Sequence, residues 1–302
     1  MNEKRPFIST PFALCALMFL LICPRAQAAS AAERPVVFVS IPPQAWLIKR
    51  LAGEAVEVQT LLTSGANPHT YEPTARQVRK LAEAKLYLTV GMPFETPLAT
   101  RAVKLNPALK MAAMDAGIKK RGSHAHDHDD HGHADSDPDC CGTGGDPHIW
   151  LSPRLMCAMA SNTLAALAEA LPENRTQMTE NLHGAMAEIL AADDTVRAGL
   201  KDLKSRTWVV YHPSWGYFAE TYGLTLLIIE QDGKTPSAKH LAQVIRQAQA
   251  AGVKTVFTEP QYDKRPARIL AEQIGARLTV IDPLQEDWPA LMRDVAKKLA
   301  GE

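Results

Sequence analysis

Several features that would place the chain in a common class are missing from it. The 302 residues carry 33 basic and 33 acidic side chains, so the net charge is zero and no surface for nucleic acid is expected. Two of the five cysteines lie in the first 28 residues, and the three that remain, an odd number, argue against a disulfide-rich scaffold. Beyond those 28 residues, no apolar run is long enough to span a bilayer.

The motifs of common enzymes are missing as well. The sequence has no His-Glu-x-x-His motif of zinc proteases, no phosphate-binding P-loop, no Gly-x-Ser-x-Gly nucleophile turn and no glycine-rich dinucleotide motif. We therefore expect a protein that is not an enzyme.

Residues 1–28 have the features of a cleavable signal peptide. A basic start is followed by an apolar stretch at residues 7–22 and by a small-x-small cleavage site that ends at Ala28. A lipoprotein anchor at Cys23 is the alternative, although the bulky Ile22 stands where a small residue is expected. We predict cleavage after Ala28 and an exported, soluble protein.

Apolar, β-branched segments alternate with segments of helical periodicity along the rest of the chain. The predicted strands span residues 35–40, 55–62, 85–90, 109–114, 207–211, 224–229, 253–258 and 277–281. The predicted helices span residues 74–84, 94–105, 153–171, 217–222, 237–251 and 264–274, with two more starting at Pro42 and Trp288. This alternation predicts an α/β fold with mostly parallel sheets covered by helices on both faces.

The organisation into lobes rests on one long segment without proline. Residues 173–205, if helical throughout, would span roughly 50 Å, which is long for a helix inside one domain. We therefore predict two α/β lobes, at residues 29–170 and 206–302, joined by one long connecting helix at 171–205. Residues 117–145 are too polar and rich in glycine to fold alone, which predicts a flexible His-rich loop.

Three histidines and one aspartate, two from each predicted lobe, lie beyond the carboxyl ends of predicted strands. They are His69, His148, His212 and Asp282. Open α/β sheets bind ligands at that edge, so a metal cleft between the lobes is predicted. Three imidazoles and a carboxylate would complete a four-coordinate Zn²⁺ site. Such a site leaves no position for a substrate water, which favours binding over hydrolysis.

Each of these residues also has a simpler interpretation. A single loop histidine is often a surface residue, and an aspartate before proline is often a turn residue. We also expect surface positions for His183 on the connecting helix and for His240 on an amphipathic helix. Asp146 either orients His148 or forms a turn. The competing carboxylates are Glu259 and Asp263, followed by Glu230 and Asp232.

Five further histidines alternate with acidic residues ahead of His148. They are His124, His126, His128, His131 and His133. Such a tract is typical of low-affinity metal capture, and a solvated loop is the alternative. The adjacent Cys140 and Cys141 could bind a soft metal, bridge to each other, or pair with Cys157.

Five motifs, in order, resemble one known family, the metal-specific periplasmic solute-binding proteins of ABC importers, in particular the zinc-uptake (ZnuA-type) branch. The resemblance covers essentially the whole chain after the signal segment. It is carried by Asn-Pro-His-Thr-Tyr-Glu-Pro at 67–73, Asp-Pro-His-Ile-Trp-Leu-Ser-Pro at 146–153, Tyr-His-Pro-Ser-Trp-Gly-Tyr-Phe at 211–218, Glu-Pro-Gln-Tyr at 259–262 and Ile-Asp-Pro-Leu at 281–284.

The resemblance implies a function. The family's metal ligands fall on His69, His148, His212 and, in many members, Asp282, and the imidazole at 212 favours zinc over manganese. It implies a periplasmic, monomeric protein that captures Zn²⁺ and delivers it to an ABC permease and its ATPase. It also implies that the long helix limits hinge opening, so that release depends on local loop motion. The alternatives are a periplasmic metal buffer or chaperone acting through the His/Cys-rich loop, a homologue for manganese or another divalent metal, and a zinc hydrolase.

Overall fold

The computed structural model describes residues 1–3, 34–63, 65–122, 145–231 and 233–301. The chain divides into two units, Met1–Glu33 and Arg34–Glu302, and the second carries all the helices and strands described below. The predicted signal peptide lies almost wholly outside the described residues. None of the described helices combines the length and the apolar character needed to cross a membrane.

The first half of this unit forms a parallel four-stranded sheet in the order β2-β1-β3-β4. Its strands are β1 (Val36–Val39), β2 (Glu57–Thr60), β3 (Leu86–Thr89) and β4 (Lys110–Ala113), and Val37 of β1 pairs with both Val58 and Leu86. The connecting helices are α1 (Pro42–Ala52), α2 (Ala75–Ala82) and α3 (Glu95–Leu105). Every strand predicted in this half is present, two to four residues shorter than its apolar run.

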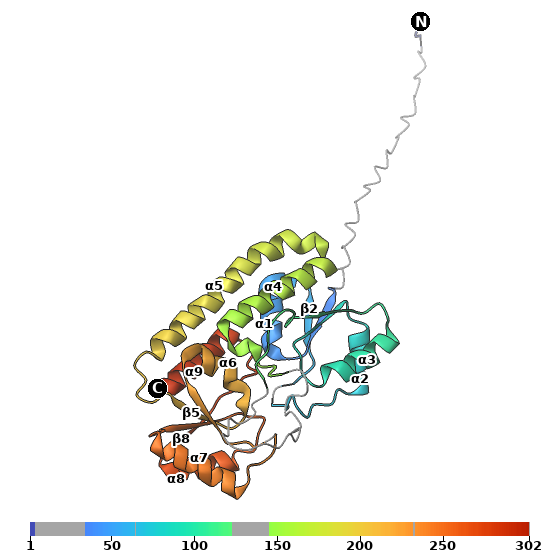
Figure 1. Cartoon of the computed structure of the whole chain (residues 1–302). Coiled ribbons are helices and arrows are strands. Elements are labelled where there is room, and N and C mark those ends of the chain that lie inside the picture. The colour runs from blue at the N-terminus through green and yellow to red at the C-terminus, as the bar shows by residue number, and fades with distance from the viewer. Residues whose placement is uncertain (4–33, 64, 123–144, 232, 302) are drawn as a thin grey trace. The chain divides into compact units, whose positions relative to one another are not determined.

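The second half repeats this topology in a second parallel sheet, with the order β6-β5-β7-β8. The strands are β5 (Thr207–Val210), β6 (Thr225–Ile228), β7 (Thr255–Thr258) and β8 (Arg277–Val280). The helices are α6 (Gly216–Tyr222), α7 (Ala238–Ala250), α8 (Arg265–Ile274) and α9 (Trp288–Ala300). The predicted fold class, two lobes with parallel sheets and a long helix between them, is confirmed (Figure 1).

Polar side chains fix several helix starts. Thr74 accepts a hydrogen bond from the backbone of Gln77 ahead of α2, Ser237 accepts one from His240 ahead of α7, and Asp287 accepts one from Ala290 ahead of α9. Each of these caps satisfies a backbone N–H that has no partner within the helix. The helices therefore begin within one residue of the positions that the sequence predicts.

The connecting helix is shorter than predicted. After α4 (Pro153–Ala170), a short 3-10 turn at Pro172–Asn174 leads into α5 (Arg175–Gly199), whose 25 residues span about 38 Å at 1.5 Å per residue. The helix ends at Gly199, and Leu200 and Leu203 beyond it pack against the core. It packs against α1 and α4 of the first half and against α9 of the second (Figure 1).

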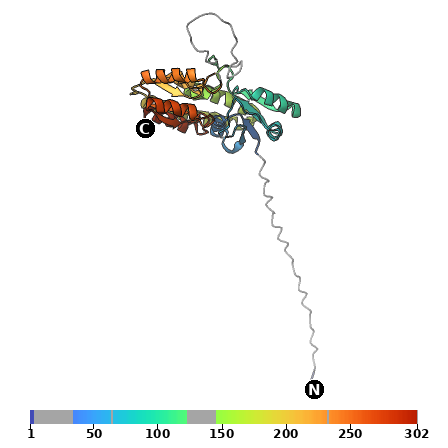
Figure 2. The same ribbon diagram turned by 90° about the horizontal axis from the view of Figure 1, so that it is seen from below.

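The hydrophobic core is shared between the two halves. One cluster runs from the first sheet through α4, α5 and α9 to one face of the second sheet, and a smaller cluster lies between the other face and α7 and α8. Figure 2 shows the second sheet between the orange helices and the red α9. Trp150 and Trp288 join the halves, since Trp150 donates its ring N–H to the Pro283 carbonyl and Trp288 donates to the Trp150 carbonyl.

Candidate metal centre

His69 lies on the loop that follows β2. Asn67 Oδ1 accepts a hydrogen bond from the His69 backbone at 2.8 Å, and Tyr71 donates its hydroxyl proton to the Leu61 carbonyl at 2.7 Å. Gln77 of α2 reaches the same carbonyl. The loop backbone is thus held at both ends. The Nδ1 atom of the half-buried His69 ring has no hydrogen-bond partner among the described residues.

His148 is held by the aspartate two residues before it. Asp146 Oδ1 lies 2.7 Å from His148 Nδ1 and also accepts the His148 backbone N–H at 3.0 Å. Both side chains are 3% exposed. A carboxylate on Nδ1 places the ring proton there and leaves the lone pair on Nε2, the arrangement usual for a metal-binding histidine.

His212 lies two residues after β5 and is held in the same way. Its Nδ1 atom lies 2.8 Å from Glu230 Oε2, beyond the neighbouring strand β6, and both side chains are 4% exposed. The ring of Tyr262 stacks on the imidazole with centroids 4.8 Å apart. Glu230 therefore orients His212 as Asp146 orients His148.

The three imidazoles converge. One nitrogen atom from each of His69, His148 and His212 lies within 4.8 Å of the other two, and His69 Nε2 is 3.0 Å from His212 Nε2. Nitrogen atoms about 2.0–2.1 Å from a tetrahedral zinc ion lie roughly 3.3 Å apart, so small side-chain movements would complete such a site. Among the described residues, no other group of three or more potential ligands comes together.

The electrostatic surroundings of His69 keep its ring uncharged. Burial, and then the neighbouring His212 and His148, lower the pKa of His69 from 6.5 to about 2. The ring is therefore neutral at physiological pH, as a metal ligand must be. Because Glu230 binds the proton on His212 Nδ1, His212 Nε2 offers a lone pair, to which His69 Nε2 donates. A metal at His69 Nε2 would therefore require the other tautomer of His69, with its proton on Nδ1.

The predicted fourth ligand, Asp282, does not belong to this group. Its Oδ1 atom accepts hydrogen bonds from Gln261 Nε2 at 2.7 Å and from the Leu284 backbone at 3.0 Å. The competing Glu259 is fully buried and accepts the ring N–H of Trp215 at 3.2 Å. Asp263 is exposed and pairs with Arg265.

The remaining candidates lie elsewhere. His183 is exposed on α5, and His240 of α7 contacts the Ile228 carbonyl, so neither lies in the histidine group. Cys157 of α4 is a half-buried free thiol. The His124–His133 tract, Cys140, Cys141 and Asp232 lie outside the described residues.

Two features of the site were weak in the sequence. Glu230 was only a minor ligand candidate, although its place two residues after a strand in the second lobe is the same as that of His212 and Asp282. Tyr217, whose hydroxyl contacts Asp146, lies in the motif at 211–218, but nothing in the sequence indicates that contact.

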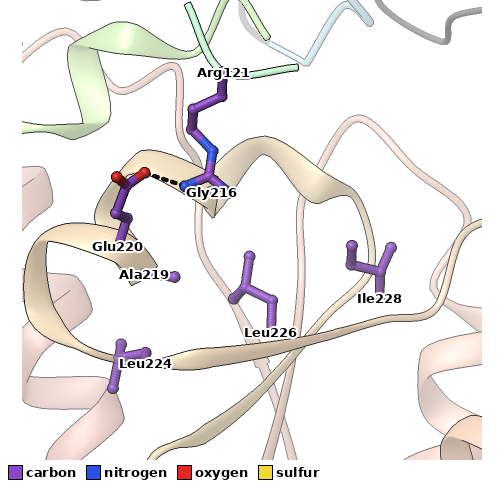
Figure 3. Close-up of a pocket in the computed structure, with 7 residues that line it drawn as sticks. All are labelled: Arg121, Gly216, Ala219, Glu220, Leu224, Leu226 and Ile228. Atoms are coloured by element: carbon purple, nitrogen blue, oxygen red, sulfur yellow. Dashed lines mark hydrogen bonds and ion pairs between the residues drawn. The ribbon is translucent and has the colours of Figure 1, made fainter. Parts of the chain in front are cut away.

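A separate hollow of about 250 Å³ lies against β6 (Figure 3). It is lined by Leu226 and Ile228 of β6 and by Leu224 just before the strand, and Arg121 reaches over it to pair with Glu220 of α6. No member of the histidine group lines it.

The fold and the site define a two-lobed α/β protein with a three-histidine centre between two parallel sheets. Residues 37–301 match the model of the family described as zinc-uptake complex component A, periplasmic, and the chain belongs to this family.

Similar proteins from bacteria support this membership. The chain is 24% identical over 281 residues to zinc-binding protein AdcA of Streptococcus pyogenes serotype M3, a match that covers 90% of the chain and 55% of AdcA. The chain thus spans about half the length of this relative. It is 27% identical over 265 residues to high-affinity zinc uptake system protein ZnuA of Bacillus subtilis, covering 86% and 82% of the two chains.

Solved structures are similar over most of the chain. A crystal structure of ZnuA has a TM-score of 0.81 and 33% identity, covering 89% of this chain and 99% of the other. A zinc-bound ZnuA deletion mutant has a TM-score of 0.79 and 34% identity, covering 89% and 97%.

Proposed function

We propose that this protein captures Zn²⁺ between its two lobes and delivers it to an ABC-type permease driven by an ATPase. The observation that carries the proposal is the convergence of His69, His148 and His212, whose nitrogen atoms come from both lobes. Neutral imidazoles suit zinc, and the carboxylates behind two of them raise their basicity. The names of the relatives, zinc-binding protein and zinc uptake system protein, support the choice of metal.

In the proposed zinc site, protein side chains fill all four coordination positions. Asp282 is the proposed fourth ligand, and it would have to leave its hydrogen bond with Gln261 to reach the metal. With four protein ligands, no position remains for a reactive water, which supports binding rather than catalysis.

The proposed setting is the periplasm, with residues 1–28 removed on export and the mature chain acting as a monomer. The proposed lobes comprise residues 29–170 and 206–302, with the connecting helix at 171–205. Zinc release would depend on local movement of the His69 loop rather than on wide opening, because the shared core and the Trp150–Pro283 hydrogen bond join the lobes. The tract from His124 to His133 is proposed as a low-affinity collector.

The ligands are tested with His212→Ala and a matched control, His183→Ala, which removes an exposed histidine from α5. We expect one tight zinc equivalent in the wild type, and an affinity loss for His212→Ala of at least about 100-fold, the upper end of what losing an orienting residue costs. Zinc content by mass spectrometry and affinity by chelator competition measure both.

Deletion of residues 123–133 tests the collector. The tight equivalent should survive this deletion and the His183→Ala change. If the deletion removes tight zinc while His212→Ala keeps it, the metal-buffer alternative replaces the transport proposal.

A further inference from the structure

The hydroxyl of Tyr217 lies between two segments that matter for the histidine centre. Tyr217 belongs to α6 in the second lobe, five residues after His212, and is only 5% exposed. Its hydroxyl oxygen accepts the Arg121 backbone N–H at 2.8 Å and donates its own proton to the Asp146 carbonyl at 2.9 Å. One side chain thus holds the two chain segments that precede His148.

This contact leads directly to a proposed ligand. The Asp146 backbone N–H donates to the Arg121 carbonyl at 3.0 Å, so the hydroxyl and the two backbones close a small ring of hydrogen bonds. The side chain of Asp146 in turn holds His148 at both Nδ1 and the backbone. Two residues therefore connect the β5–α6 unit, which carries His212, to the ring of His148.

We infer that the Tyr217 hydroxyl is a positioning group that sets the distance between His148 and His212 across the two lobes. This inference rests on the proposed function, since it concerns the spacing of the proposed zinc ligands. Tyr217 would touch no metal, and it acts through Asp146. His69 is not held through Tyr217: its backbone is held by Asn67 of its own loop, and its ring meets His212 directly, with the Nε2 atoms 3.0 Å apart. The hydroxyl therefore acts on the pair His148 and His212.

The hydroxyl can be removed without removing the ring. The Arg121 guanidinium lies 5.6 Å from the centre of the Tyr217 ring and pairs with Glu220 (Figure 3), and these contacts hold a phenylalanine equally well. The loss of the hydroxyl alone would leave the Arg121 N–H and the Asp146 carbonyl without this partner in a buried place. The segment that carries Asp146 and His148 would then move to find other partners.

The experiment compares Tyr217→Phe with Tyr222→Phe. Tyr222 lies on the same helix, is 7% exposed, and donates its hydroxyl to Asp193 of α5 at 2.8 Å, away from the histidines. Both changes remove one buried hydroxyl. We expect Tyr217→Phe to weaken zinc binding about 10-fold, as the loss of a buried hydrogen bond allows, and Tyr222→Phe to change it less than about 2-fold.

A second readout separates positioning from a general loss of stability. In metal-free protein, nuclear magnetic resonance follows the exchange of the His148 Nδ1 proton with solvent. We expect faster exchange in Tyr217→Phe than in wild type, and no change in Tyr222→Phe. Urea unfolding of both variants is the control, and it should show a similar loss of stability in each, since each loses one buried hydroxyl.

The outcomes are distinct. Equal zinc affinities of the two variants would overturn the inference. So would an unchanged exchange rate of the His148 Nδ1 proton in Tyr217→Phe. If the wild type itself binds no tight zinc, the proposed function fails. The exchange rate of the His148 Nδ1 proton still tests whether Tyr217 holds that ring in place.

Discussion

The two sheets of this protein have the same strand order, but their functional side chains lie at different distances beyond the strand ends. In the second sheet, His212, Glu230, Glu259 and Asp282 each lie one or two residues beyond a strand. In the first sheet, His69 lies nine residues after Thr60 and His148 lies 35 residues after Ala113. In the second lobe, therefore, the strand ends position the polar groups. In the first lobe, the loops that follow the strands position the histidines.

The clearest difference is between the two buried glutamates that follow the third strand of each sheet. Glu95, after β3, is buried and accepts three backbone N–H groups, from Val90, Gly91 and Met92. Glu259, after β7, is fully buried and accepts the ring N–H of Trp215. Burial raises the pKa of both carboxyl groups, and for Glu259 the pKa rises to about 8. The first lobe thus uses its buried glutamate to hold a loop, whereas the second holds one that is mostly uncharged at neutral pH.

The largest expected effect concerns this buried acid. Because the pKa of Glu259 rises from 4.5 to about 8 on folding, the folded protein keeps a proton that the unfolded chain releases. The contribution of this one group to stability should be full below pH 4.5 and should be lost as the pH rises through about 8. Glu259→Gln, which still accepts from Trp215, should be more stable than wild type by about 2–4 kcal/mol at pH 8.5 and similar at pH 5. Urea unfolding with chelator present measures this.

Glu95→Gln is the matched change in the first sheet. A glutamine amide cannot accept three N–H groups, so this variant should be less stable than wild type at both pH values. If Glu95→Gln and Glu259→Gln changed stability in the same direction at both pH values, the two buried glutamates would not differ in role.

The next effect compares the two carboxylates that orient histidines. Glu230→Gln and Asp146→Asn should each weaken zinc binding about 10- to 100-fold, since neither amide holds the Nδ1 proton as a carboxylate does. Chelator competition measures the affinities, and Glu188→Gln, an exposed partner of Arg50, serves as control. Unchanged affinity in both variants would mean that the carboxylates only stabilise the fold.

The smallest effect is expected at Asp282. To coordinate zinc, its carboxylate must give up its hydrogen bonds to Gln261 and Leu284, and that cost offsets part of the gain. Asp282→Asn should therefore weaken zinc binding only about 10-fold, well below the loss for His212→Ala. Affinity equal to wild type would remove Asp282 from the ligand set and leave the fourth position to water.

Much of the fold follows from local patterns. Apolar runs and helical periodicity predicted all eight strands within a few residues, and the caps at Thr74, Ser237 and Asp287 are visible in the sequence. The connecting helix is shorter than the run without proline that predicts it, because Leu200 and Leu203 leave the helix to pack against the core. The contact of Asp146 with His148 is local too, as only one residue separates them.

Only the tertiary structure decided which atoms meet at the centre. His69 and His212 are 143 residues apart in sequence, and Glu230 reaches His212 from the next strand over. Tyr217 could not be recognised as a partner of Asp146, because the contact depends on how α6 packs against a segment of the other lobe. By itself the sequence determined the elements and the three histidines, since both follow from short-range patterns. The packing of two lobes on a shared core decided their geometry.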